Sequence, residues 1–150
     1  MNKKTMTIGY TSGVFDLFHI GHLNLLMNAK GICDKLIVGV TTDDLSLYKG
    51  KKPLIPFEDR FEIIRSIKYV DAVVPQDTMD KAEMCKKLNA SILFVGDDWY
   101  GTTKWKTIEQ ELSAIGIRVV YFPYTKGVSS TIIGNTLVEV RGWSLDESSK

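Results

Sequence analysis

The chain has 150 residues, of which 44% are hydrophobic and 25% are charged, with 19 Lys and Arg against 18 Asp and Glu. This length fits one domain with an ordinary core, and the formal net charge of +1 lacks the basic excess of general nucleic-acid binders. No apolar run approaches the roughly 18 residues of a membrane span, and the N-terminal stretch does not read as a secretory signal. The isolated Cys33 and Cys85 suit a reducing compartment. We expect one cytoplasmic domain over residues 1–150 that binds no membrane and no nucleic acid.

Short apolar runs alternate with amphipathic segments along the chain. The runs are rich in Val and Ile and nearly continuous in apolar character, as expected of strands buried on both faces. This alternation predicts an α/β fold with a doubly wound parallel sheet in a single domain. The expected strands are Met6–Tyr10, Leu36–Thr41, Ala72–Val74, Ile92–Val95 and Val119–Phe122. The expected helices are His22–Lys30, Phe57–Lys68, Met79–Leu88 and Thr107–Ile115, and Gly31, Asn89 and Gly116 stand where helix ends are expected.

Two stretches, Asp43–Pro56 and Asp97–Lys106, fit no helix or strand well. Ligands of doubly wound sheets bind beyond the carboxyl ends of the strands, where such loops gather. We therefore expect both stretches to lie near a ligand site. The polar tail over Trp143–Lys150 is expected to fray.

The strongest functional signal directly follows the first expected strand. Gly13 lets the backbone pass close to a ligand, and a helix that starts near Gly21 directs its N–H groups and positive dipole end at the same space. His19 and His22, the two histidines of the chain, lie three residues apart and share a face of the first helical turn. Two imidazoles above a helix N-terminus can hydrogen-bond an anion. This arrangement predicts a phosphate site.

Two further stretches carry phosphate-binding chemistry. Lys126-Gly127-Val128-Ser129-Ser130-Thr131 follows the last strand and opens a final helix. One hydroxyl there would serve as an N-cap, which stabilises a helix by about 1 kcal/mol, but three in a row exceed that need and could hold phosphates. Lys49, Lys51 and Lys52 form either a solvated surface or a source of positive charge for phosphates.

The stretch Gly13-x-Phe15-Asp16-x-x-His19-x-Gly21-His22 resembles the signature of the cytidylyltransferase-like nucleotidyltransferases. Within this superfamily the chain is most similar to the glycerol-3-phosphate cytidylyltransferases, over roughly residues 6–133. The resemblance implies a Rossmann-like fold of the HxGH nucleotidyltransferase type, and a homodimer. Further matching motifs are Thr41-Thr42-Asp43, Lys49-Gly50-Lys51-Lys52, Phe57-Glu58-Asp59-Arg60, Tyr69-Val70-Asp71, Gly96-Asp97-Asp98-Trp99 and Gly127-Val128-Ser129-Ser130-Thr131.

The same resemblance implies the residues that contact the nucleotide. Asp98 and Trp99 are expected near the base, although Trp99 could instead cap the core. The full expected set is Gly13, Val14, Phe15, His19, His22, Lys51, Asp98, Trp99, Thr125, Lys126, Gly127, Ser129, Ser130 and Thr131.

Catalytic and acceptor-binding residues are implied in the same way. His19, His22, Lys51 and Arg60 match catalytic residues, although Arg60 could also be an ordinary surface charge beside neighbouring glutamates. The acceptor phosphate is expected at Lys49 and Lys81. The match of Lys81 needs a gap, and an ordinary helix-surface lysine is its alternative.

The family motif RTEGISTT shows two departures in this chain. Tyr124 stands where the family has arginine, and Lys126 stands where it has glutamate. One phosphate-binding cation is thus lost and another appears two residues on, where Lys126 is expected to supply the same charge.

These residues suggest no covalent intermediate. They describe in-line attack of an acceptor phosphate oxygen on the α-phosphorus of CTP, with pyrophosphate leaving and Mg²⁺ carried by the triphosphate, without protein metal ligands. The resemblance implies sn-glycerol 3-phosphate as the acceptor, which would give CDP-glycerol, a precursor of teichoic-acid-type or other glycerol-phosphate polymers. The alternatives are phosphocholine, phosphoethanolamine or a polyol or sugar phosphate as acceptor, an ATP-using adenylyltransferase, and a nucleotide-binding regulatory module without catalysis.

Overall fold

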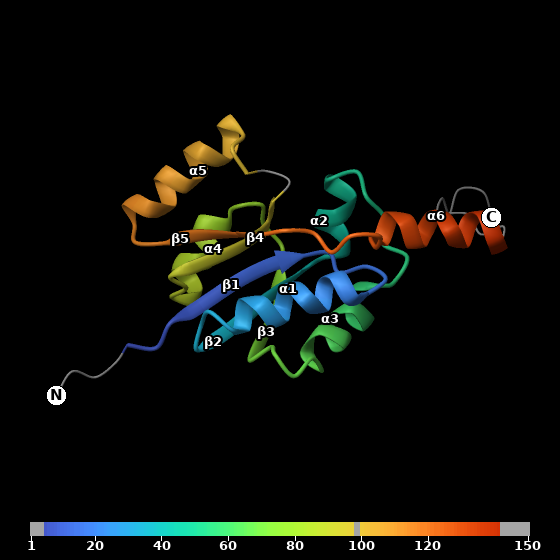
Figure 1. Ribbon diagram of the computed structural model, residues 1–150, viewed down its shortest axis with the longest axis horizontal. Coiled ribbons are helices and arrows are strands. Elements are labelled where there is room, and N and C mark those ends of the chain that lie inside the picture. Colours follow the sequence, from blue (N-terminus) through green and yellow to red (C-terminus); the bar gives the residue numbers. More distant parts are fainter. Residues whose placement is uncertain (1–4, 98–99, 142–150) are drawn as a thin grey trace.

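Five parallel strands form the centre of the molecule, in the order β3-β2-β1-β4-β5. The computed structural model describes residues 5–97 and 100–141, and in this part of the chain helices cover both faces of the sheet (Figure 1). The strands are β1 Ile8–Gly13, β2 Lys35–Thr41, β3 Ala72–Gln76, β4 Ile92–Gly96 and β5 Arg118–Phe122. The helices are α1 Ile20–Lys30, α2 Asp43–Tyr48, α3 Phe57–Arg65, α4 Lys81–Leu88, α5 Thr103–Ala114 and α6 Ser130–Arg141.

Each face of the sheet has its own apolar core. Leu26 of α1 and Ile64 of α3 lie in one buried cluster, whereas Met84 of α4 and Leu112 of α5 lie in the other. Strands covered on both sides need apolar residues at consecutive positions, which explains their nearly continuous hydrophobic runs. The predicted doubly wound α/β fold is confirmed.

The strand order changes direction at β1. The chain builds β1, β2 and β3 outward on one side and then adds β4 and β5 on the other side of β1. Connections that leave neighbouring strands in opposite directions open a crevice at the carboxyl end of the sheet. Helix α6 projects beyond that end, on the right of Figure 1, so residues 123–129 lead from β5 toward it.

Two predictions about the first half of the chain are wrong in their boundaries. The first strand is β1 Ile8–Gly13 instead of Met6–Tyr10, because its ladder with β2 extends over the polar residues up to Gly13 and Val40. The stretch Asp43–Pro56 is not without structure, since it begins with α2. Thr42 starts this helix by accepting the Leu45 N–H on its side-chain oxygen at 3.2 Å, an ordinary N-cap.

Four helix boundaries also differ from the prediction, two of them because of side-chain caps. Helix α5 begins at Thr103, inside the stretch Asp97–Lys106 that was expected to be irregular, because Thr102 caps it. Asp80 caps α4, which therefore begins at Lys81 instead of Met79. The second expected helix ends at Arg65 instead of Lys68, and the first begins at Ile20 instead of His22. None of the helices in the described ranges is both long and apolar enough to cross a membrane.

Candidate active site

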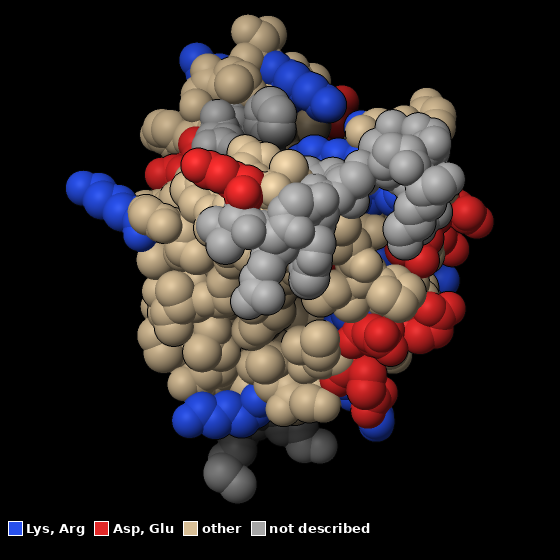
Figure 2. All heavy atoms as spheres, turned by 90° about the vertical axis from the view of Figure 1, so that its right-hand side faces the viewer, with Lys and Arg blue, Asp and Glu red and all other residues tan. Residues whose placement is uncertain are grey.

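A pocket of about 860 Å³ opens at the carboxyl end of the sheet. Figure 2 looks onto this end of the molecule, where acidic side chains gather mainly along the right-hand edge. The walls come from the end of β1 and the loop that follows it, the start of α1, residues 50–54, the end of β4, residues 122–125 and the start of α6. The lining includes ten predicted site residues: Gly13, Val14, Phe15, His19, His22, Lys51, Thr125, Ser129, Ser130 and Thr131.

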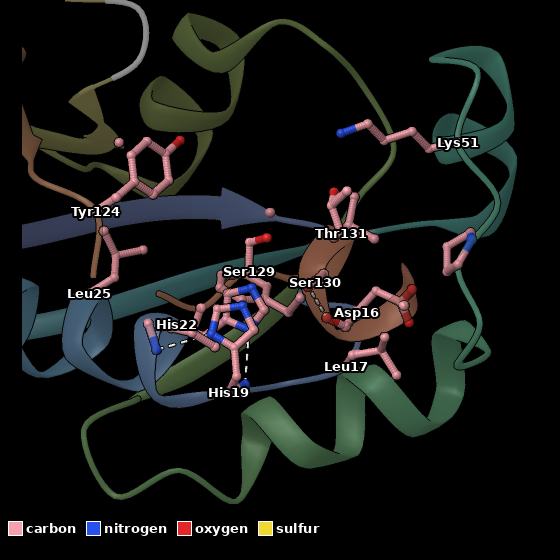
Figure 3. Close-up of a pocket in the computed structure, with 18 of the residues that line it drawn as sticks. Asp16, Leu17, His19, His22, Leu25, Lys51, Tyr124, Ser129, Ser130 and Thr131 are labelled. Atoms are coloured by element: carbon pink, nitrogen blue, oxygen red, sulfur yellow. Dashed lines mark hydrogen bonds between the residues drawn. The ribbon is translucent and has the colours of Figure 1, made fainter. Parts of the chain in front are cut away.

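The HxGH motif forms a reciprocal cap on helix α1. His19 is the N-cap residue, and its Nδ1 accepts the Gly21 N–H at 3.0 Å. His22 Nδ1 in turn accepts the His19 backbone N–H at 3.3 Å. A Cβ at Gly21 would lie 2.8 Å from His19 Cε1, so only glycine leaves room for this ring. The two imidazoles stack with centroids 3.9 Å apart, as seen at the centre of Figure 3.

This geometry fixes the protonation of both rings. Because each Nδ1 accepts a backbone N–H, each neutral ring carries its proton on Nε2. Burial lowers the pKa of His19, and burial together with the neighbouring His19 lowers the pKa of His22 to about 4. Both histidines are therefore neutral hydrogen-bond donors at pH 7, on the wall of the pocket.

The loop between β1 and α1 is built to support His22. Phe15 and Leu17 both have positive φ angles, of 53° and 51°, a conformation that side chains rarely adopt outside constrained sites. The buried Phe15 ring meets His22 edge-on at 5.3 Å, and Phe18 packs against His22 at 5.4 Å. A Cβ at Gly13 would lie 3.2 Å from the Phe15 ring, so the missing side chain makes room for that ring.

Arg60 lies behind the pocket and not on its wall. Its side chain is fully buried, with 0% exposure, so the alternative of an ordinary surface charge is wrong. Its guanidinium donates to the carbonyl oxygens of Val14, Thr41 and Ile55 at 2.7–2.8 Å and pairs with Asp43 at 2.6 Å. These contacts join the loop after β1, the end of β2 and the segment before α3, so Arg60 positions the loops of the site. Its predicted catalytic role stays a prediction.

The start of α6 uses two of its three hydroxyls within the fold. Ser129 Oγ accepts the Ile132 N–H at 3.0 Å, which makes it a helix cap and leaves its proton available to a ligand. Ser130 Oγ donates to the Asp16 carbonyl oxygen, which ties α6 to the β1–α1 loop. Thr131 faces the pocket in Figure 3. The helix N-terminus therefore opens into the same space as the histidines.

Residues 10–135 match the sequence profile of the family described as Cytidylyltransferase-like. The chain belongs to the cytidylyltransferase-like family. Glycerol-3-phosphate cytidylyltransferase of Bacillus subtilis strain 168 is 38% identical over 124 residues, which cover 82% of this chain and 91% of that protein. FAD synthase of Pyrococcus abyssi strain GE5/Orsay is 38% identical over 116 residues, covering 75% of this chain and 77% of that protein.

A solved structure agrees with this assignment. The lipopolysaccharide core biosynthesis protein from Thermoplasma volcanium GSS1 superposes with a TM-score of 0.69 at 25% identity, covering 83% of this chain and 100% of that one. The family and these relatives make the chain a nucleotidyltransferase of the cytidylyltransferase type.

In this cytidylyltransferase-like site the lysines gather at one end. Lys51 lines the pocket, with Lys52 beside it. Lys81 is not an isolated surface lysine, because its Nζ donates at 3.0 Å to Ser12 Oγ on the pocket wall. Burial, with smaller effects from nearby charges including Lys49, lowers the pKa of Lys81 to about 8. Lys49 does not line the pocket, and burial together with the charge of Lys51 lowers its pKa.

Other predicted residues lie elsewhere. Lys126 and Gly127 are exposed and do not line the pocket, so their contact with nucleotide phosphates stays a prediction. Tyr124 takes part in the lining instead. Asp98, Trp99 and the tail 143–150 lie outside the described residues.

Sequence reasoning also missed residues of the lining. Leu25 follows His22 by three positions on α1, and Asn135 follows Thr131 by four on α6, so helical spacing could have found both. The role of Asn24 could not be predicted from spacing. Its Nδ2 donates to Thr125 Oγ1 at 3.0 Å and so holds the segment between β5 and α6 against α1.

The described carboxylates do not form a metal site. Among residues 5–97 and 100–141, no three His, Cys, Asp or Glu side chains gather to hold a metal ion. Asp16 lies on the pocket wall, but its two carboxylate oxygens accept the backbone N–H groups of Leu54 and Ile55 at 2.9 and 3.0 Å. Asp16 therefore fastens the β1–α1 loop to the segment that carries Lys51.

Proposed function

We propose that the protein transfers a cytidylyl group from CTP to sn-glycerol 3-phosphate, giving CDP-glycerol and pyrophosphate. The observation that carries this proposal is the pair of neutral Nε2–H donors of His19 and His22 beside the N-terminus of α6. Preformed donors of this kind stabilise charge that develops on phosphate oxygens during transfer. The 38% identity to the Bacillus subtilis glycerol-3-phosphate cytidylyltransferase supports the choice of nucleotide and acceptor.

The mechanism needs positioning more than proton transfer. The acceptor phosphate is already anionic, so its oxygen can attack the α-phosphorus in line with the departing pyrophosphate without a general base. His19 and His22 donate to α- and β-phosphate oxygens, while Ser129, Thr131 and Lys51 hold the β- and γ-phosphates. Since no carboxylate cluster is present in the described residues, Mg²⁺ would arrive bound to the triphosphate and neutralise part of its charge.

We place the acceptor phosphate at Lys49 and Lys81, on the side of the α-phosphorus opposite the departing pyrophosphate. Lys81 donates to Ser12 on the pocket wall, and the charges of Lys49 and Lys51 lie near it. These charges attract a phosphomonoester on a neutral polyol and repel the cationic head of phosphocholine or phosphoethanolamine. This argument favours glycerol 3-phosphate, or another polyol or sugar phosphate, over amine-bearing acceptors. A homodimer, as the resemblance implies, is part of the proposal.

A second candidate is transfer of an adenylyl group from ATP. The similarity to the Pyrococcus abyssi FAD synthase favours it, because FAD contains an adenosine half. The histidine pair would act on ATP in the same way, so the site chemistry does not separate the two candidates.

Pyrophosphate release in the presence of Mg²⁺ tests the proposal directly. CTP and ATP are each combined with sn-glycerol 3-phosphate, FMN, phosphocholine, phosphoethanolamine and a panel of sugar phosphates. We expect turnover with CTP and glycerol 3-phosphate, with no release when the acceptor is omitted. Turnover with ATP and FMN alone would establish the second candidate, and nucleotide binding without turnover would indicate a regulatory module.

A further inference from the structure

A series of hydrogen bonds runs from helix α4 through the sheet and back to the start of that helix. Lys81, the first residue of α4, donates its Nζ to Ser12 Oγ at 3.0 Å, and Ser12 lines the pocket. Ser12 also hydrogen-bonds the phenol of Tyr10, two positions earlier on β1. Tyr10 donates to Gln76 Oε1 at the end of β3, and Gln76 Nε2 donates to the Thr78 carbonyl oxygen. Since Thr78 precedes Lys81 by three positions, this polar network links the start of α4 to β1 and β3.

Two members of the polar network lie in the core. Tyr10 is 0% exposed and Gln76 is 3% exposed. A Cβ at Gly39 on β2 would collide with the Tyr10 oxygen and lie 3.2 Å from Gln76 Oε1, so a glycine there makes room for both side chains. Replacing two such partners by apolar groups of the same shape is close to neutral for stability. The buried pair therefore points to a role other than packing.

The direction of these hydrogen bonds fixes the orientation of each group. Burial raises the pKa of Tyr10, so the phenol keeps its proton and donates it to Gln76. The Ser12 hydrogen bond acts against this rise, as a donor to the phenol oxygen does, so Ser12 gives its proton to Tyr10 and accepts from Lys81. Within residues 5–97 and 100–141, Ser12 is the acceptor for one of the three N–H groups of the Lys81 ammonium, which leaves two for a ligand oxygen.

We propose that Tyr10 and Gln76 are positioning residues that hold the Lys81 ammonium at the pocket wall through Ser12, and that they thereby set the affinity for the acceptor phosphate. A side chain that is already held in place loses less conformational freedom when it binds a ligand, so its orientation contributes to affinity. The inference rests on the proposed function in placing the acceptor phosphate at Lys81. It holds for any phosphorylated acceptor, and for CTP or ATP as the nucleotide.

Steady-state kinetics on Tyr10→Phe test the inference. The substitution keeps the ring in the core but removes the oxygen that connects Ser12 to Gln76. With the acceptor that the pyrophosphate assay identifies, the acceptor KM should rise about threefold to tenfold, the usual order for one hydrogen bond. The kcat and the nucleotide KM should stay at wild-type values. An unchanged acceptor KM, or an equal rise of both KM values, would overturn the inference.

A double-mutant cycle with Lys81→Met separates positioning from a general effect on the fold. Once the ammonium is removed, the polar network has no charge to hold. Adding Tyr10→Phe to Lys81→Met should therefore leave the acceptor KM where Lys81→Met alone puts it. A further rise as large as that of Tyr10→Phe alone would mean that Tyr10 acts independently of Lys81, and would contradict the inference.

Two further variants control for the loss of a buried hydroxyl. Tyr121→Phe is the matched control, because its phenol donates to Glu109 and the residue does not line the pocket, so both KM values should stay unchanged. Tyr10→Phe combined with Gln76→Met removes both buried partners and should melt close to wild type. This double variant should still show the raised acceptor KM, and a wild-type acceptor KM in the folded double variant would refute the positioning role.

Failure of the inference and failure of the proposed function give different results. Turnover with an acceptor other than glycerol 3-phosphate overturns the proposed product, while the KM of that acceptor still tests Tyr10. A wild-type acceptor KM in Lys81→Met would remove the acceptor from Lys81 and overturn the inference, whatever the product. A protein that turns over no phosphorylated acceptor overturns both proposals.

Discussion

The histidines and the lysines of the pocket are held in contrasting ways. His19 and His22 cap the same helix turn, stack on each other and pack against Phe15 and Phe18, so their donors have fixed directions. Lys51 instead belongs to an exposed segment after α2. Fixed neutral donors suit a transition state whose geometry is defined, whereas cations on longer side chains suit the attraction of a mobile anionic substrate.

The largest expected effect is a loss of stability when the side chain that connects these two regions is replaced. Arg60 binds Val14 in the histidine loop and Ile55 in the lysine-bearing segment at once. Arg60→Met should lower the free energy of unfolding by about 3–5 kcal/mol, because it leaves Asp43 and three carbonyl oxygens without their buried partner. Chemical denaturation measures this loss.

Arg65→Met on the same helix is the matched control for Arg60. Arg65 is exposed and pairs with Glu62 within one turn of α3, and such pairs contribute little. Equal stability losses for the two variants would contradict the role of Arg60 in connecting the histidine loop to the segment that carries Lys51.

Removal of one histidine should cost catalysis more than stability. His22→Ala, or His19→Ala, should reduce turnover by about 10²–10³, the usual loss for one preorganised donor to a developing charge. Pyrophosphate release measures turnover, and thermal melting follows the fold. For His19, Asn is the informative replacement, because it can cap the helix without offering an imidazole Nε2–H. His19→Asn should therefore keep the melting temperature of wild type but not its turnover; retention of more than about a tenth of the activity would exclude the donor role.

How much of the structure could be predicted depended on how far apart in the sequence the contacting residues lie. The HxGH turn was predictable because its partners lie within three residues and their spacing alone gives a shared helix face. The fold followed from continuous apolar runs for the same local reason. The buried contacts of Arg60 could not be predicted, because its partners at Val14 and Thr41 lie 46 and 19 residues away, which no local pattern reveals.

The lining around Tyr124 shows the same limit. The sequence marked Tyr124 only as a departure from a motif and assigned the missing charge to Lys126. Which of two neighbouring side chains enters a pocket depends on the path of the backbone, here set by Gly96 behind Tyr124 and by the contact of Thr125 with Asn24, 101 residues apart. Contacts between residues far apart in the sequence therefore determine that Tyr124, and not Lys126, lines the pocket, which the motif comparison could not predict.

The smallest expected effect is a pH dependence confined to the acceptor. The Lys81 amine lies near the cations Lys49 and Lys104 and the Cys85 thiol, and it donates to Ser12; burial is the main reason that its pKa falls to about 8. Below that pH the amine is charged and attracts an acceptor phosphate, and above it the neutral amine attracts the phosphate less. The KM for the acceptor should therefore rise as pH passes about 8, while kcat/KM for the nucleotide stays level, because both histidines are already neutral there.

A variant pair tests whether Lys81 is the titrating group. Lys81→Met should raise the acceptor KM by about tenfold at pH 7, the usual order for one lost hydrogen bond to a charged group, and should remove the rise near pH 8. Lys87→Met, which removes an exposed lysine from the same helix, should keep the wild-type profile. If the acceptor KM still rises near pH 8 in Lys81→Met, another group is titrating. The lysines would then attract the acceptor through their combined charge, and no single amine would bind its phosphate.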